Sequence, residues 1–367
     1  MNTDFSPDVL VLLTGGETTM KKNERGVYEI VPLETLRILM SNLQTHDSDF
    51  AKKKNLKDTL FALPPSESGD RIIYKVKEYT ELKDSSNISI EDWEKIAQDI
   101  KNEYERYKGF VVLHGTDTIA YTASALSFMM HGLTKPVILT TSRFPVSEQT
   151  SKCFDNLINA LNICCYYQIQ EQQVAILYEK VLFRGNRVTI FSSDDQVNFE
   201  SPNYPPLAYE NTFRTSPSTE RNLTPNDETR HVQFQTTMSK NVGILRLFPG
   251  VTSRLINNFM NSGLEGIVLQ TYGAGNIASE NKEVLEEIRL ACTQGAIIVN
   301  CSQCSRGSVS LTYATNTGLQ GVGVLSGGDM TTEAAFAKLS FVLAQEGLSL
   351  EEKKRMMITN ISGELSS

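Results

Sequence analysis

The sequence has few cysteines, and their spacing argues against a metal or disulfide scaffold. Only six of its 367 residues are cysteine, and a single pair, Cys301 and Cys304, has CxxC spacing. No second pair accompanies it, so a zinc site is not expected. The cysteines lie mostly in apolar segments, which predicts reduced, structural thiols as in a cytosolic protein. We therefore expect no metal and no cofactor.

Long apolar runs and an excess of basic residues are also missing. No run approaches the roughly 18 apolar residues of a membrane span, so no membrane partner is expected. Residues 1–8 lack the basic and apolar regions of a signal peptide, which predicts a cytoplasmic protein. The net charge of −8 and the pI near 5.3 argue against nucleic acid as a partner. A small-molecule ligand is the remaining expectation.

The order of apolar segments predicts an α/β fold with two domains. Short runs rich in strand-forming residues alternate with helical patterns, which is typical of a doubly wound, mostly parallel sheet. We expect a large N-terminal domain over residues 1–200 that carries the functional site. Prolines and weak periodicity predict an interdomain linker over 201–240, and a second strand–helix series predicts a smaller α/β domain over 241–367.

One polar turn stands out among the predicted strand ends. Residues 110–114 read as a buried strand, followed by Gly115, the polar Thr116-Asp117-Thr118 and an apolar helix over 119–130. Ligands bind at such carboxyl ends of strands in open α/β sheets. The alternative is an ordinary N-cap cluster, since Thr and Asp are preferred caps. His114 is predicted to be a hydrogen-bonded core residue rather than a general base.

Other local patterns predict further elements around that turn. Residues 9–13 form a short apolar run, and Gly15-Gly16 after it either admits a ligand close to the backbone or makes a tight turn. Residues 49–70 look irregular. Residues 179–189 read as a hairpin whose turn lies at Arg184-Gly-Asn-Arg187.

Taken together, an ordered set of segments resembles the type I, cytoplasmic L-asparaginases in their animal form. The likeness extends from about Val9 to Leu365, and its most specific parts are residues 109–118, 120–128, 245–250, 271–276, 298–301 and 329–334. The resemblance implies the asparaginase-like fold and hydrolysis of L-asparagine to aspartate and ammonia. It also implies a homodimer or homotetramer.

Carried over by position, the substrate-holding residues of that family are present. Asp84 and Ser85 match the pair that binds the α-amino and carboxylate groups of the substrate. Thr116 and Asp117 match the second catalytic threonine and its aspartate, and both also contact substrate. Gly16 and Ser142 fall at further substrate-binding positions, on turns after the first and third strands of the motif set.

The residues that carry the family's chemistry are replaced. Glu17 stands where the family has its nucleophilic threonine, and Ile190 stands where it has its catalytic lysine. Arg143 and Lys152 also stand where the family has different residues. Thr18 and Thr19 could act as displaced nucleophiles only if the turn shifted by a residue, and Met20, in its family position, argues against that.

Three hypotheses follow. The first is a catalytically inactive or strongly impaired pseudoenzyme that keeps part of an L-asparagine or L-aspartate pocket. The second is an active amidohydrolase, or a hydrolase of altered substrate in which Glu17 acts as a base. The third is a structural subunit that assembles with an active paralogue. The loss of both Thr and Lys at one reaction centre favours the first.

Overall fold

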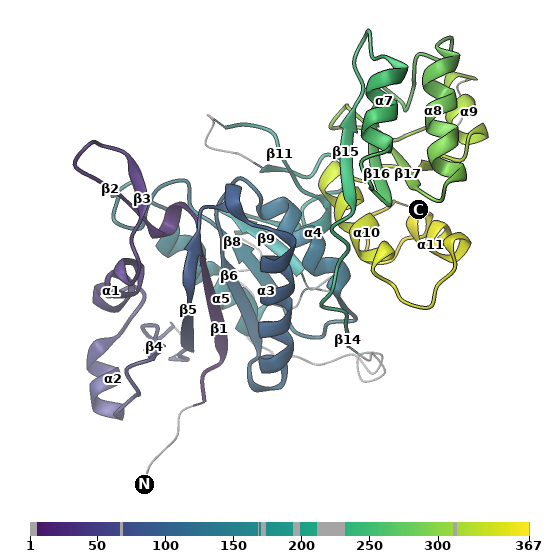
Figure 1. Cartoon of the computed structure of the whole chain (residues 1–367). Coiled ribbons are helices and arrows are strands. Elements are labelled where there is room, and N and C mark those ends of the chain that lie inside the picture. Colours follow the sequence, from purple (N-terminus) through teal and green to yellow (C-terminus); the bar gives the residue numbers. More distant parts are fainter. Residues whose placement is uncertain are drawn as a thin grey trace. The chain divides into compact units, whose positions relative to one another are not determined.

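The computed structural model describes residues 6–66, 69–167, 169, 174–193, 199–210, 232–310 and 314–366. The chain forms two compact units, and it passes between them more than once (Figure 1). The first unit comprises residues 1–123, 130–184 and 206–234, and the second comprises 124–129, 185–205 and 235–367. The division of the sequence at residues 200 and 240 stays a prediction.

The first unit is built on an eight-stranded sheet in which most neighbours are parallel. Its order is β13-β10-β9-β8-β6-β1-β5-β4, and β1 lies between β5 and β6. Three pairs of neighbours are antiparallel: β4 with β5, β9 with β10, and β10 with β13. The bounds are β1 Val9–Gly15, β4 Leu60–Ala62, β5 Ile73–Lys83, β6 Gly109–Leu113, β8 Val137–Thr140, β9 Val174–Tyr178, β10 Val181–Arg184 and β13 Ala208–Tyr209.

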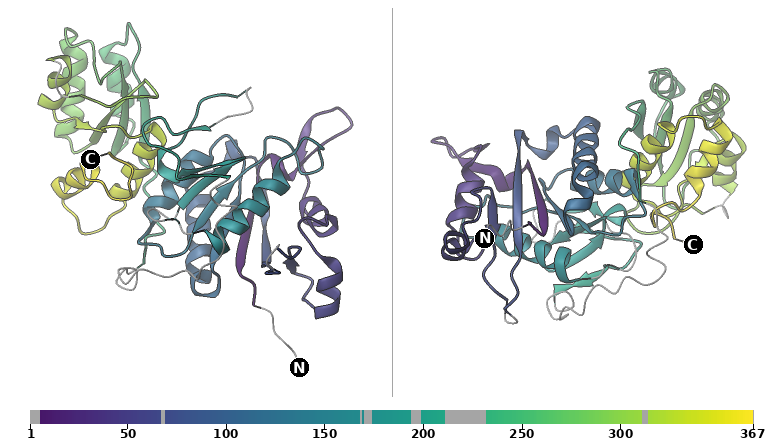
Figure 2. Two further views of the ribbon diagram at one scale, coloured as in Figure 1. Left: turned by 180° about the vertical axis from the view of Figure 1, so that it is seen from behind. Right: turned by 90° about the horizontal axis from the view of Figure 1, so that it is seen from below.

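Helices cover both faces of this sheet. In Figure 1 the helix α3 lies in front of the strands, and the view from behind in Figure 2 shows α5 crossing the other face. Apolar side chains of β1, β6, β8 and α5 form one fully buried core cluster. The predicted cap of α3 is confirmed, because the Ser89 N–H donates to Asp92 over 2.8 Å. The helices are α1 Glu34–Ser41, α2 Ser48–Lys54, α3 Ile90–Glu103, α4 Ile119–Met129 and α5 Cys153–Tyr166.

Short elements complete the first unit. A small hairpin of β2 and β3 projects beyond the main sheet in Figure 1, and β7 pairs with β14. Three 3-10 turns, η1 to η3, follow β1, β5 and α3. Their bounds are β2 Met20–Lys22, β3 Tyr28–Ile30, β7 Met130–His131, β14 Gln233–Phe234, η1 Glu17–Thr19, η2 Ser85–Asn87 and η3 Tyr104–Arg106.

The second unit is a smaller α/β layer structure, as predicted. Its four strands are all parallel in the order β15-β16-β17-β18. Apolar residues of α7, α8 and the strands share a buried cluster, and α10 packs against the same strands. The bounds are β11 Thr189–Ile190, β12 Phe199–Glu200, β15 Val242–Arg246, β16 Gly266–Thr271, β17 Ile297–Ser302, β18 Leu325–Ser326, η4 Gly185–Arg187, α7 Ser253–Met260, α8 Lys282–Thr293, α9 Ala314–Gly321, α10 Thr332–Leu343 and α11 Leu350–Ile358.

Two local predictions are wrong. Residues 49–70 are not irregular, because they include most of α2 and the whole of β4. The hairpin predicted over 179–189 turns earlier in the chain than predicted. Its strands are β9 and β10, and its turn lies at Glu179, whose φ is 51°, rather than at residues 184–187. Of the predicted linker, residues 211–231 lie outside the described residues.

Candidate functional site

Three turns meet at the carboxyl ends of neighbouring strands in the first unit. They follow β1 at Gly15 and Gly16, β5 at Asp84, and β6 at Gly115. The chain passes from β1 to β5 on one side and returns to β6 on the other, so β1 marks the point where the strand order reverses. Such a switch point is where open α/β sheets bind ligands.

Glycines let these turns touch. Gly16 has a φ of 76°, and a Cβ built there would lie 2.3 Å from the Gly115 Cα. A Cβ on Gly115 would in turn lie 2.5 Å from the Ser85 Oγ. A side chain at either glycine would therefore push the turns apart. The close approach, rather than turn shape alone, accounts for both glycines.

Glu17 spans two of the turns. Its carboxylate accepts the Thr116 backbone N–H, with the Oε2 atom 3.0 Å from the nitrogen, and its Oε1 atom accepts the Thr116 hydroxyl. Thr116 is buried, and Glu17 is partly buried. The structure brings these two predicted positions into direct contact. Their roles stay predictions.

The surroundings of Glu17 shift the pKa of its carboxyl group. Burial raises the pKa of Glu17 above its ordinary value of 4.5, and the nearby charge of Asp117 adds to that rise, while the bonds from Thr116 oppose it. Among the described residues, no lysine or arginine nitrogen lies within 4.0 Å of this carboxylate. Lys152 pairs instead with Asp155 over 3.7 Å. The Arg143 guanidinium lies 5.6 Å from the centre of the Phe144 ring.

Ser85 joins the second and third turns. The Asp117 N–H donates to the Ser85 Oγ over 3.1 Å, and the Thr118 hydroxyl donates to the Ser85 carbonyl over 2.7 Å. Asp84 caps its own 3-10 turn by accepting the Ser86 N–H. Asp117 is exposed and Asp84 partly so. The predicted residues Asp84, Ser85, Thr116 and Asp117 therefore gather in one cluster with Gly16 and Glu17.

Two predicted positions are placed differently. Ser142 is buried, and its hydroxyl donates to the Phe144 carbonyl over 2.9 Å and lies 3.1 Å from the Ser151 Oγ, so it is engaged within its own loop. Ile190 belongs to the second unit, where it pairs with Phe199.

The other threonines near Glu17 are buried. Thr14 donates its hydroxyl to the Leu113 carbonyl over 2.9 Å, and Thr19 donates to the Gly16 carbonyl over 2.8 Å. Thr18 is fully buried. All three side chains are therefore shielded from solvent.

A buried chain of hydrogen bonds, which the sequence did not predict, orients the third turn. The His114 Nδ1 atom donates to the Gly115 carbonyl over 2.9 Å, and its Nε2 atom accepts the Thr122 hydroxyl at the same distance. Trp93 in turn donates to Thr122. Burial lowers the pKa of His114 to about 4, so the ring is neutral. Its expected place as a hydrogen-bonded core residue is confirmed.

The hydrogen bond from His114 to the Gly115 carbonyl also sets the direction of the Thr116 N–H. The Gly115 carbonyl and the Thr116 N–H belong to one planar peptide group and point in opposite directions. Fixing the carbonyl on His114 therefore aims the N–H at Glu17. His114 bonds Thr122 of α4, which in turn accepts from Trp93 of α3, and no local sequence signal links either residue to the turn after β6.

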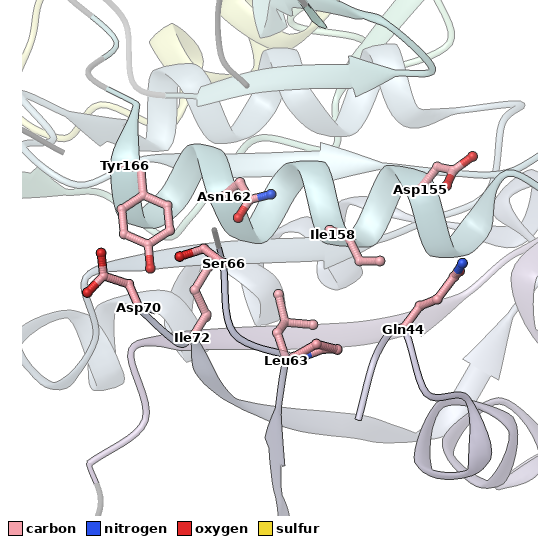
Figure 3. Close-up of a pocket in the computed structure, with 10 residues that line it drawn as sticks. Gln44, Leu63, Ser66, Asp70, Ile72, Asp155, Ile158, Asn162 and Tyr166 are labelled. Carbon is pink, nitrogen blue, oxygen red and sulfur yellow. The ribbon is translucent and has the colours of Figure 1, made fainter. Parts of the chain in front are cut away.

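A separate cavity of about 390 Å³ lies along α5 (Figure 3). Asp155, Ile158 and Tyr166 line one side from that helix, and Ile72 lines the other. Ile72 precedes β5, whereas Lys83 ends it, so this cavity faces away from the turn cluster. None of the predicted site residues lines it. Within the described residues no His, Cys, Asp and Glu side chains group as metal ligands, and no helix is long and apolar enough to cross a membrane.

Comparison with known families matches nearly the whole chain. Residues 8–221 match the family described as "Asparaginase, N-terminal", and residues 241–357 match "Glutaminase/Asparaginase C-terminal domain". The two matched regions leave residues 222–240 between them, and the first match includes residues 201–221 of the predicted linker.

Individual relatives agree with these matches. The chain is 36% identical to the "L-asparaginase 1" of Escherichia coli over 98% of both chains. It is 40% identical to the "60 kDa lysophospholipase" of Mus musculus and to the "L-asparaginase" of Dirofilaria immitis, but it spans only about three fifths of their lengths (62% and 60%). The crystal structure of L-asparaginase I from Vibrio cholerae superposes with a TM-score of 0.78 at 32% identity, covering 98% of this chain and 100% of that one.

Proposed function

Because this chain belongs to the asparaginase family, we propose that it keeps part of the family's L-asparagine or L-aspartate pocket while having lost most or all amide hydrolysis. The observation that carries the proposal is the contact between Glu17 and Thr116. It commits the Thr116 hydroxyl proton to a carboxylate at the position where the family has its nucleophile.

Glu17 is a poor replacement for that nucleophile. If its carboxylate attacked an amide, the tetrahedral species would expel carboxylate more readily than ammonia and revert to reactants. A water-based route in which Glu17 serves as general base would place its charge near the carboxylate of the substrate. Two like charges about 4 Å apart at an effective dielectric of about 20 repel by about 4 kcal/mol before screening.

The binding residues support retention of the ligand. The Asp117 N–H and the Thr118 hydroxyl donate to Ser85, and Asp84 directly precedes Ser85 as the N-cap of the 3-10 turn η2. Calorimetric titration with L-asparagine and L-aspartate tests this half of the proposal. We expect heat of binding that Asp84→Ala abolishes, and the absence of heat with both amino acids contradicts it.

A hydrolase of altered substrate is a second candidate, because the raised pKa of Glu17 suits a general base. Esters would be the better substrates, since their leaving group departs more easily than ammonia. This candidate requires Glu17→Ala to abolish ester turnover, and unchanged turnover in that variant removes it. The whole protein's partners are also proposals: a homodimer or homotetramer in the cytosol, or a structural subunit that co-purifies with an active paralogue.

A further inference from the structure

We propose that Glu17 makes this pocket selective for the side-chain amide of L-asparagine over the side-chain carboxylate of L-aspartate. The inference rests on the proposed retention of the amino acid pocket. It assigns to Glu17 a role in recognition, as a residue that determines specificity, in place of the nucleophilic role that the family gives this position.

The Glu17 carboxylate has acceptor capacity left. An ionised carboxylate offers about four acceptor positions on two oxygens. Thr116 uses part of them through its N–H and its hydroxyl. Glu17 is only partly buried, so its side chain is not closed off from solvent. An amide NH2 supplies two donors for these positions, whereas an ionised carboxylate supplies none.

The acidic side chains at this site also favour L-asparagine over L-aspartate. Glu17, Asp84 and Asp117 place three acidic side chains on the three turns that meet at this site. L-Aspartate would bring a second carboxylate to this acidic cluster, and L-asparagine would bring a neutral amide in the same shape.

Recognition by a fixed acceptor discriminates strongly between such close analogues. A site built to bond a ligand's N–H groups leaves its own polar group unpaired when the analogue lacks them. We expect wild type to bind L-asparagine at least about tenfold more tightly than L-aspartate, a modest estimate for such sites. Gln at position 17 keeps the shape but can both donate and accept, so the preference should disappear.

The experiment is calorimetric titration of both amino acids into the full chain at pH 7.5. It compares wild type with Glu17→Gln, with Glu17→Thr as a second variant of the same position. Glu148→Gln is the matched control, because it removes one negative charge from a loop carboxylate that pairs with Lys22. Circular dichroism establishes that each variant is folded.

The expected result is a preference for L-asparagine in wild type and Glu148→Gln, and a ratio near one in both Glu17 variants. Equal affinities in wild type, or an unchanged preference in both Glu17 variants, would overturn the inference and leave the retained pocket standing. No heat with either amino acid in any variant would overturn the retained pocket, and the inference with it.

Discussion

Thr116 donates both its backbone N–H and its hydroxyl to the carboxylate of Glu17, a residue 99 positions earlier in the chain. Hydrogen bonds to a charged acceptor are stronger than neutral ones. The contact therefore joins the turn after β1 to the turn after β6 and occupies the donors of Thr116.

Glu17 should lower stability at neutral pH. Since burial raises its pKa, the folded protein holds this proton more tightly than the unfolded chain does. Stability then falls as pH rises from the unfolded value of about 4.5 through the folded pKa. Glu17→Gln removes this titration. We expect its urea midpoint to exceed that of wild type at pH 7.5 and the difference to shrink towards pH 4.5. A difference that is constant with pH contradicts the assignment.

Gly16 should tolerate no side chain. Gly16 and Gly26 both have a φ of 76°, but a Cβ at Gly26 meets nothing within 4 Å, whereas at Gly16 it meets Gly115 backbone at 2.3 Å. Gly26→Ala should cost about 1–2 kcal/mol of unfolding free energy from backbone strain alone. Gly16→Ala should cost several kcal/mol more, on the order of an overpacked core. Equal losses in urea titrations would mean that the turns can separate freely.

His114 should be a positioning residue that carries its proton on Nδ1. Only that tautomer donates to the Gly115 carbonyl and accepts from Thr122. Nitrogen-15 NMR of the ring should show this form, with the Thr116 amide protected from hydrogen exchange.

Substitutions at Thr122 test the same chain of hydrogen bonds. Thr122→Val removes the hydroxyl and should cost about 1–3 kcal/mol, because buried partners lose their bonds. It should also speed exchange of the Thr116 amide. Thr122→Ser keeps the hydroxyl and should preserve the protection. Normal Thr116 protection in the valine variant would show that these hydrogen bonds do not orient this peptide.

A buried ion pair stabilises the second unit. The Lys338 Nζ atom lies 2.6 Å from the Glu364 carboxylate, and both side chains are fully buried. Lys338→Met leaves an unpaired buried acid and should cost about 3–5 kcal/mol of unfolding free energy. The double variant with Glu364→Gln should recover part of that loss. Additive losses in a double-mutant cycle would show that the two charges do not interact.

Much of this arrangement could be predicted from the sequence, because local patterns dominate it. The apolar runs of β1, β6, β8 and β9 end in polar or glycine-rich turns, and parallel strands bring such ends to one edge. The grouping of Gly16 and Ser85 with Thr116 follows from that rule. The cap of α3 by Ser89 likewise depends on residues three positions apart.

The features that the sequence did not predict depend on contacts between distant residues or on unusual backbone geometry. Thr122 of α4 bonds His114 and accepts from Trp93 of α3, and nothing near the turn indicates either residue. The early hairpin turn at Glu179 requires a left-handed backbone that Glu rarely adopts, so its sequence gives no turn signal. Ser142 lies at a predicted binding position, but its hydroxyl donates to the Phe144 carbonyl of its own loop.

Ammonia release from L-asparagine tests the central claim most directly. Wild type should be compared at millimolar substrate and high protein loading with Glu17→Thr, with Ile190→Lys and with the double variant. We expect no release from wild type and measurable release from the double variant, since the second threonine's proton transfer typically contributes about 10²–10⁴-fold. Ammonia release by wild type at a rate comparable to that of the double variant would contradict the proposed loss of hydrolysis.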